Sequence, residues 1–214
     1  MKAIVLAGSK GIGKGISDQL QSICDDVIST SSSDLDTSNI EQVKSFVEKQ
    51  KETDILVLNT GGPPAKNFFD VTEEEWLKYY NQLFYSFVYI LQNLHINDGG
   101  YIFLISSHQI KEPKDTMSLS VAYRVAFSSI LKLLTKQYAN REVSCINIAP
   151  GPIGTERLKN LTGDISKLEE RLPMGRVGKV EELGLFVKSL VENDIKYLTG
   201  VTINFDGGYS NYIL

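Results

Sequence analysis

Short apolar runs alternate along this chain with longer amphipathic segments, and this alternation limits the fold more than any other feature of the sequence. Such alternation is typical of a parallel sheet with helices on both faces, a doubly wound α/β architecture. Strands are expected near Lys2 to Ala7, Asp26 to Thr30, Asp54 to Asn59, Tyr101 to Ser106, Glu142 to Ile148 and Val201 to Asn204. Helices are expected over Gly13 to Ile23, Asn39 to Lys49, Glu73 to Leu94, Leu119 to Asn140 and Val180 to Glu192.

The region after the second expected strand is too short for a full repeat of this pattern. A parallel crossover needs roughly ten or more residues and usually contains a helix. The strand that ends near Thr30 is followed within a few residues by Asp36 and a new helix start, for which Thr37 or Ser38 is a suitable N-cap. The third strand and its preceding helix are therefore predicted to be shortened or missing, which leaves six main strands.

Composition narrows the classes of function. A chain of 214 residues with 42% apolar and 22% charged residues suits one packed domain. Its net charge of −4 makes nucleic acid a poor partner, and no apolar stretch is long enough to span a membrane. No signal peptide is expected at the N-terminus, so a cytoplasmic location is the default. Cys24 and Cys145 are expected to pack as small hydrophobic residues, and His95 and His108 lack the companions that a metal site needs.

The first expected strand runs directly into the glycine-rich turn Ala7-Gly8-Ser9-Lys10-Gly11-Ile12-Gly13 and then into a helix. Glycines at such a turn let the backbone approach a pyrophosphate that rests on the helix N-terminus. A glycine cluster by itself is a weak signal, and a purely structural turn is the alternative.

The glycine turn resembles that of the short-chain dehydrogenase/reductase family, with Ala7 at the first glycine position and Gly11 and Gly13 at the following pair. Ala7 can replace glycine there if its φ is negative. Further segments resemble the family in the same order: Asn59-Thr60-Gly61, Pro150 to Thr155, Arg176-Val177-Gly178, Leu198-Thr199-Gly200 and Asp206-Gly207-Gly208. The resemblance implies a Rossmann-type, mostly parallel sheet in a single dinucleotide-binding domain over residues 1–214, with a lid-like segment at about 152–176.

The same resemblance implies which residues bind the cofactor: Ala7, Ser9, Lys10, Gly11, Ile12, Gly13, Ser32, Asp36, Asn59, Gly61, Arg124, Pro150, Gly151, Ile153 and Thr155. Hydroxyls from Ser31 to Ser33 and the base Lys10 favour the ribose phosphate of NADP(H). Asp34 lies in the same stretch, and NAD(H) remains a possible cofactor.

The catalytic positions of the family carry unusual residues in this chain. Ser107 matches the family serine, but Ser120 stands where the tyrosine is expected and Arg124 where the lysine is expected. An alignment on Trp76 puts Leu83 at the asparagine position. A serine hydroxyl is a far weaker acid than a tyrosine, and an arginine stays protonated and cannot relay a proton. We therefore expect the positive charge of Arg124 to stabilise negative charge at the site, and we expect the proton relay of the family to be absent.

Two other residues could replace the missing proton donor. Tyr123 is adjacent to Arg124, but one residue turns a side chain by about 100° around a helix, so packing is the favoured role. His108 follows Ser107, and an ordinary hydrogen bond is its favoured role. Gly61-Gly62-Pro63-Pro64 is interpreted as a rigid turn, and the charges between Glu156 and Arg176 are expected to cover a mobile lid rather than bind a specific anion.

The leading hypothesis is an NADP(H)-preferring oxidoreductase that transfers hydride to or from a small carbonyl or alcohol substrate. Ser107 would polarise the substrate oxygen, Arg124 would bind ribose and add positive potential, and Ser120 would relay through water. The alternative is a catalytically silent dinucleotide-binding or redox-sensing module, because three of the four catalytic positions are altered. The resemblance also implies a homodimer or homotetramer formed through the two longest helices.

Overall fold

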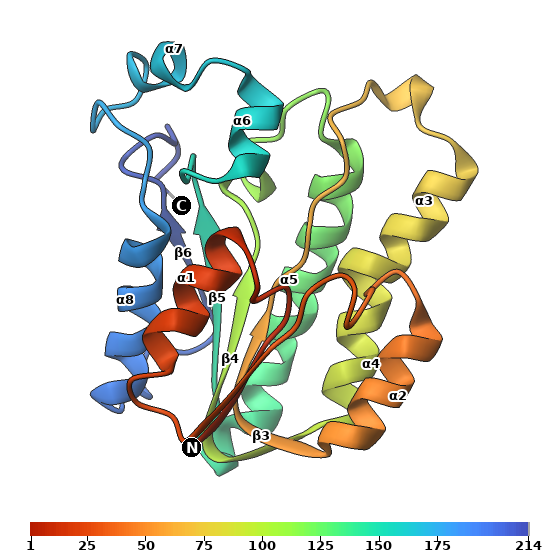
Figure 1. Cartoon of the computed structure of the whole chain (residues 1–214), viewed down its shortest axis with the longest axis vertical. Helices are drawn as coiled ribbons and strands as arrows, with labels where there is room; N and C mark the ends of the chain where they lie inside the picture. Colours follow the sequence, from red (N-terminus) through yellow and green to blue (C-terminus); the bar gives the residue numbers. More distant parts are fainter. Residues whose placement is uncertain (214) are drawn as a thin grey trace.

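The computed structural model describes residues 1–213 of the chain, and one parallel sheet runs through the centre of this part (Figure 1). The strand order is β2-β1-β3-β4-β5-β6, and every neighbouring pair is parallel. The strands are β1 (Lys2–Val5), β2 (Asp26–Ser29), β3 (Glu52–Leu58), β4 (His95–Ile105), β5 (Ser144–Pro150) and β6 (Val201–Phe205). The doubly wound α/β prediction is confirmed.

Helices cover both faces of this sheet (Figure 1). The α-helices are α1 (Gly11–Leu20), α2 (Ile40–Gln50), α3 (Glu73–Tyr80), α4 (Ser86–Asn93), α5 (Ser118–Tyr138), α6 (Glu156–Thr162), α7 (Ile165–Glu169) and α8 (Val180–Glu192). Short 3-10 turns add η1 (Phe68–Asp70), η3 (His108–Ile110) and η4 (Ala139–Arg141), and α3 and α4 are joined by one π-helical turn, η2 (Asn81–Tyr85). Within the described residues, no helix is both long enough and apolar enough to cross a bilayer.

Two hydrophobic cores form because successive strand residues point to opposite faces. In β1, Ile4 belongs to the core beneath α2, α4 and α5, whereas Ala3 and Val5 belong to the core beneath α1 and α8. Both faces of the central strands are fully buried, which explains their continuous apolar runs.

The shortened region after β2 is present as predicted. Residues 30–39 form turns without a strand, and β2 is the edge of the sheet. The N-cap prediction was wrong: Asn39, rather than Thr37 or Ser38, accepts hydrogen bonds from the amides of Glu41 and Gln42. Thr37 instead turns inward, where it is buried and pairs with the Thr60 hydroxyl at 3.0 Å.

Several boundaries also differ from the expected ones. The expected helix from Glu73 to Leu94 is interrupted by the π-helical turn, and α1 begins at Gly11 rather than Gly13. Strand β4 begins at His95 rather than Tyr101, because its first two residues pair with β3 before the chain makes an irregular excursion through Gly99 and Gly100. None of these shifts changes which residues lie at the carboxyl edge of the sheet.

The loops that follow the strands gather at that edge (Figure 1). Helices α6 and α7 lie there as well, between β5 and α8 in the sequence. Ligands bind at the carboxyl ends of strands in open parallel sheets of this type. This edge is therefore the place to look for a functional site.

Candidate active site

The glycine-rich turn leads from β1 to α1 and has no room for side chains at its centre. A Cβ on Gly13 would lie 2.2 Å from the carbonyl oxygen of Ala7, and Gly11 has a φ of 53°. Ala7 itself has a φ of 48°, so the condition of a negative φ, under which alanine can replace glycine there, is not met. The left-handed conformation costs a residue with a Cβ roughly 1–2 kcal/mol, so the turn holds Ala7 under strain.

Neighbouring side chains fix the shape of this turn. The Asn59 carboxamide donates to the carbonyl oxygens of Leu6 and Ala7 at 3.3 and 3.5 Å. The Ala7 amide donates to the Thr30 hydroxyl at 3.1 Å. Asn59 was predicted to bind the cofactor, and the structure shows it supporting the backbone of the turn.

The loop after β5 lies against the opposite side of the turn. The Thr155 methyl group would be 3.4 Å from a Cβ on Gly11, and both residues line a cavity of about 280 Å³. The loop is held by Gly154, whose amide donates to Gly178 at 2.8 Å, and by Gly151, whose amide donates to Phe205 at 3.0 Å. Gly11 and Thr155, both predicted cofactor residues, thus face each other.

The stretch after β2 satisfies its own polar groups. The Asp34 carboxylate accepts from the Ser31 amide and hydroxyl, and these bonds lower its pKa. The Asp36 carboxylate accepts from the amide and hydroxyl of Ser38 at 2.9 and 2.8 Å. Ser32, Ser9 and Lys10 are exposed. The hydroxyl group of Ser32 and the ammonium group of Lys10 are therefore accessible to a ligand. The carboxylates of Asp34 and Asp36 instead accept hydrogen bonds from neighbouring serines.

Of the three predicted catalytic residues, Ser120 and Arg124 contact each other in α5, and Ser107 directly precedes η3, which packs against α5. Ser107 follows β4 and accepts a hydrogen bond from the Gln109 amide at 3.2 Å, which leaves its own O–H available as a donor. Ser120, almost fully buried in the first turn of α5, accepts from the Arg124 guanidinium at 2.5 Å. Burial and the positive charge of Arg157 lower the pKa of Arg124 to about 10, so Arg124 is still charged at neutral pH.

Each of the two alternative proton donors has a hydrogen-bond partner outside this group. The Tyr123 hydroxyl donates to the Trp76 carbonyl at 2.9 Å, and the two rings pack edge to face. His108 is buried, its Nδ1 lies 3.1 Å from the Pro150 carbonyl oxygen, and burial lowers its pKa. Both residues have the packing and hydrogen-bonding roles that the sequence favoured.

The π-helical turn decides which side chain reaches the site from the α3–α4 segment. Leu83, at the expected asparagine position, is 1% exposed and lies in the core. Its neighbour Gln82 donates to the Gly61 carbonyl at 2.7 Å and to the Thr60 hydroxyl at 3.3 Å. A π turn contains one extra residue, which shifts the face that each side chain occupies. The alignment on Trp76 put Leu83 at the asparagine position and did not identify Gln82.

A second arginine reaches the same area from α6. The Arg157 guanidinium donates to the Pro63 carbonyl at 2.6 Å and lies flat against Gly62, where a Cβ would be 2.8 Å from its terminal nitrogen. Nothing in the sequence indicated a role for this residue beyond its place among the charges of residues 156–176. The contact joins segments 94 residues apart.

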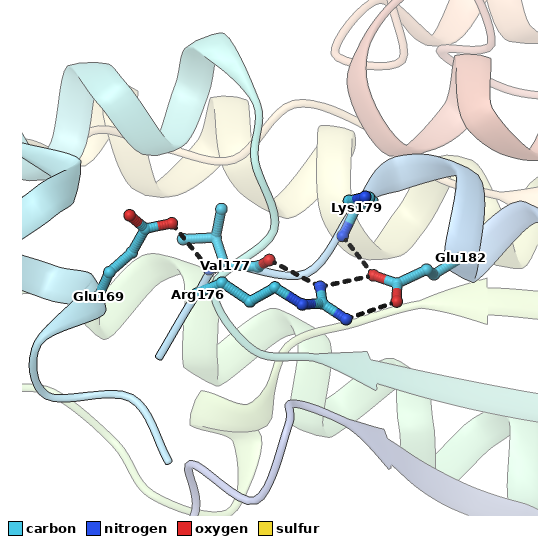
Figure 2. Close-up of polar contacts among 5 residues, drawn as sticks. All are labelled: Glu169, Arg176, Val177, Lys179 and Glu182. Carbon is cyan, nitrogen blue, oxygen red and sulfur yellow. Dashed lines mark hydrogen bonds and ion pairs between the residues drawn. The ribbon is translucent and has the colours of Figure 1, made fainter. Parts of the chain in front are cut away.

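An ion-pair network fixes the base of the segment formed by residues 152–176 (Figure 2). Arg176 donates two hydrogen bonds to Glu182, at 2.9 and 2.7 Å, and Glu182 also accepts from the Lys179 amide at 2.9 Å. The Val177 amide donates to Glu169 at 3.1 Å. These ion pairs and hydrogen bonds connect the segment to α8. A cavity of about 270 Å³ lies beside them, and Leu172, Met174 and Asp206 are among the residues that line it.

The parallel sheet and its glycine turn define a Rossmann-class dinucleotide-binding architecture. A family model described as enoyl-(acyl carrier protein) reductase matches residues 12–210. The 3-oxoacyl-[acyl-carrier-protein] reductase of Buchnera aphidicola subsp. Baizongia pistaciae is 27% identical over 234 residues, covering 96% of each chain. The chain belongs to the short-chain dehydrogenase/reductase family of oxidoreductases.

Solved structures show the same fold. A short-chain dehydrogenase family protein from Francisella tularensis subsp. tularensis superimposes with a TM-score of 0.85 at 22% identity, covering 97% of this chain and 98% of that one. A small-chain dehydrogenase in complex with NADPH superimposes with a TM-score of 0.84 at 26% identity, covering 98% of each chain.

Proposed function

We propose that this protein is an NADP(H)-preferring oxidoreductase that acts on a small carbonyl or alcohol substrate. One observation carries the proposal: Arg124 is hydrogen-bonded to Ser120 in the first turns of α5, and α5 packs against η3, the turn that directly follows Ser107, at the sheet edge that also carries the glycine turn. The related structure with bound NADPH supports the choice of cofactor.

The residues at the turn fit a dinucleotide. Gly13 lies where no side chain fits, and Gly11 has a positive φ. A turn with these two glycines lets backbone amides approach a pyrophosphate at the N-terminus of α1. We assign cofactor binding to the residues predicted for it in this turn, in the stretch after β2 and in the loop that follows β5. The exposed Ser32 and Lys10 would bind the ribose phosphate that distinguishes NADP(H). NAD(H) is the weaker alternative because Asp34, which could bind ribose hydroxyls, is occupied by Ser31.

The bound nicotinamide would supply or accept the hydride, and this chain's own residues would manage the charge on the substrate oxygen. Ser107 donates its free O–H to that oxygen. Arg124 adds positive potential where negative charge develops and holds the adjacent ribose. Ser120 is kept in place by Arg124 and passes a proton through water, since its hydroxyl is too weak an acid to act alone. Residues 152–176 would form the lid that excludes bulk water.

The proposal is tested by titrating the purified protein with NADPH and with NADH while following nicotinamide fluorescence and melting temperature. A ligand selective for the folded state raises the melting temperature. NADPH should bind more tightly than NADH, and the Lys10→Ala variant should reduce this difference. Failure of both cofactors to bind at millimolar concentration would contradict the proposal.

The altered catalytic positions also support a second function, a silent dinucleotide-binding or redox-sensing module. The double variant Ser120→Tyr/Arg124→Lys distinguishes the active oxidoreductase from the silent module. Carbonyl reduction by the natural chain supports the enzyme. Reduction that appears only in the double variant supports the silent module.

A homodimer or homotetramer is part of the proposal. Leu77, Tyr80, Tyr85, Val125 and Leu133 are large apolar side chains exposed on α3, the π turn and α5. A second copy packed on these helices would cover them. Light scattering should give a mass at least twice that of one chain.

A further inference from the structure

A buried histidine directly follows the candidate catalytic Ser107. Of the two histidines in the chain, His95 is exposed, whereas His108 is only 7% exposed. Burial lowers the pKa of His108, so its imidazole is neutral at pH 7. A polar ring that is withdrawn from water normally has a hydrogen-bond partner. The partner of His108 is the Pro150 carbonyl oxygen, 3.1 Å from Nδ1, and because a carbonyl oxygen only accepts, Nδ1 carries the proton.

This bond continues the hydrogen-bond ladder between β4 and β5 beyond the end of β4. Just past that end, the Ser106 amide donates to the Ile148 carbonyl at 2.8 Å. Bonds along one strand of a parallel ladder recur at every second residue, so the next acceptor on β5 is the Pro150 carbonyl. The backbone turns into η3 at His108, and the Nδ1–H of its side chain supplies the bond that a continued strand would make with its amide.

Ser107 is therefore held to β5 through both of its neighbours. Ser106 donates to the Ile148 carbonyl with its amide and its hydroxyl, at 2.8 and 3.1 Å. His108 donates to the Pro150 carbonyl, two residues further along β5. Pro150 begins the segment of residues 150–155, called the cofactor loop below because four of its residues are assigned to cofactor binding. The His108 bond thus sets the spacing between Ser107 and the cofactor loop.

The C-terminal segment covers the His108 ring. The Tyr209 ring packs edge to face against it, with 5.4 Å between the ring centroids. Two residues further on, the Asn211 amide donates to the Glu112 carboxylate at 2.7 Å, which ties this segment to the chain after η3. A buried carbonyl oxygen that loses its donor has little access to water, so the loss of the His108 bond should displace the loop that carries it.

We propose that His108 is a positioning residue for Ser107: its hydrogen bond to the Pro150 carbonyl holds the Ser107 hydroxyl at a fixed distance from the cofactor loop. The inference rests on the proposed function, in which Ser107 donates to the substrate oxygen. His108 acts through Ser107 and does not touch the reacting atoms. A displacement of about 1 Å in such a group can lower turnover by about 100-fold, because the reacting groups must keep a narrow range of geometries.

Two substitutions distinguish hydrogen bonding from packing. His108→Asn places an amide N–H near the position of Nδ1 but removes the ring. His108→Phe keeps a ring against Tyr209 but removes the N–H. If His108 positions Ser107, the asparagine variant should resemble the natural chain more closely than the phenylalanine variant, whereas a packing role predicts the reverse order. His95→Asn is the matched control, because His95 is exposed at the opposite end of β4.

Hydrogen exchange followed by NMR tests the positioning role without any turnover. The amides of Gln109 and Ile110 donate to the Ser107 hydroxyl and carbonyl, at 3.2 and 3.1 Å, so their protection reports how well the Ser107 turn is ordered. Their exchange should be at least about tenfold faster in His108→Phe and close to natural in His108→Asn. The amides of α2 should exchange at the natural rate in every variant, which excludes a general loss of stability.

Reduction of the small β-keto ester ethyl acetoacetate by NADPH connects this position to the chemistry. We expect kcat to fall by about tenfold or more in His108→Phe and by less than about threefold in His108→Asn. The Kd for NADPH should stay within about twofold in both, because the Gly151 amide holds the cofactor loop to β6 independently, at 3.0 Å from the Phe205 carbonyl.

The imidazole ¹⁵N signals give a further check, and the spectrum of His95→Asn assigns them. An Nε2-protonated His108 would overturn the inference. Unchanged exchange in His108→Phe, or faster exchange in His108→Asn than in His108→Phe, would overturn it as well. Absence of NADPH binding would contradict the proposed function alone, and the exchange rates would still decide whether His108 positions Ser107.

Discussion

The two halves of the sheet edge are built in different ways. In the nucleotide half, between β1 and α1, the shape is fixed by backbone: no side chain fits at Gly13, and Asn59 and Thr30 hold the turn by bonding to main-chain atoms. In the reaction half, between β4 and α5, the shape is fixed by side chains, chiefly the Arg124–Ser120 bond.

This difference explains why one half follows the family pattern and the other does not. A binding surface made of backbone can change only if the chain path changes, so its glycines are constrained by geometry. A surface made of side chains can exchange residues while the fold stays the same. We therefore expect cofactor binding to be retained and the chemistry to be specialised.

The largest effect is expected from Gly13→Ala, which tests the nucleotide half. The added methyl group would overlap the Ala7 carbonyl oxygen at 2.2 Å, so the turn must shift. The free energy of unfolding should fall by about 1–3 kcal/mol. The affinity for NADPH should fall by about 100-fold or more, because the backbone can no longer approach the pyrophosphate.

Gly99→Ala is the matched control for this change. Gly99 has a φ of 69° and open space around it, so a methyl group there adds backbone strain without overlap. Urea denaturation and fluorescence titration should show a smaller stability loss, about 1 kcal/mol, and unchanged NADPH affinity. Equal NADPH affinity in both variants would show that the turn does not bind the cofactor.

The next effect tests the reaction half through Arg124→Met. Loss of the guanidinium removes positive potential and frees Ser120, so cofactor affinity and turnover should fall together, with kcat/KM reduced about 100-fold. Arg124→Lys should retain part of both, because the charge remains. Steady-state kinetics beside NADPH titration distinguishes the outcomes. Unchanged kinetics in Arg124→Met would remove Arg124 from the site.

The fold could be predicted because its signals are local. The periodicity of the apolar residues predicted six strands and the layers of helices. The short spacing after Thr30 predicted that the usual third strand is shortened or missing. Ser107, Ser120 and Arg124 could be proposed by counting along the chain against the family's pattern, and Ser120 and Arg124 do lie one helical turn apart in α5. These predictions needed no knowledge of contacts between distant segments.

The parts of the site that escaped prediction depend on tertiary contacts or local irregularity. Arg157 meets Gly62 and Pro63 only in the folded chain. Gln82 reaches the Gly61 loop because of the π turn, which no residue count reveals. The positive φ of Ala7 follows from the path of the turn, and the alanine side chain gives no sign of it.

A smaller effect, of opposite sign, is expected from Ala7→Gly. Glycine adopts a φ of 48° without a steric penalty, although it loses more entropy on folding than alanine does. The free energy of unfolding should rise by about 1 kcal/mol, with NADPH affinity unchanged. Urea denaturation measures this, with Ala149→Gly in buried β5 as a control that should lower stability. A loss of stability in Ala7→Gly would mean that the turn is not strained.

The smallest effect concerns the Arg176–Glu182 ion pair, which connects the segment of residues 152–176 to α8 (Figure 2). Arg176 lowers the pKa of Glu182 from 4.5 to about 2. Because the pKa is lowered on folding, this pair stabilises the protein above about pH 4.5, and the contribution is lost as the pH falls toward 2.

Glu182→Gln should therefore lower the melting temperature slightly at pH 7 and flatten its decline between pH 4.5 and 2. The effect should be small, because the pair is exposed and screened by solvent. An equally steep decline in the variant would show that other carboxylates carry the acid sensitivity.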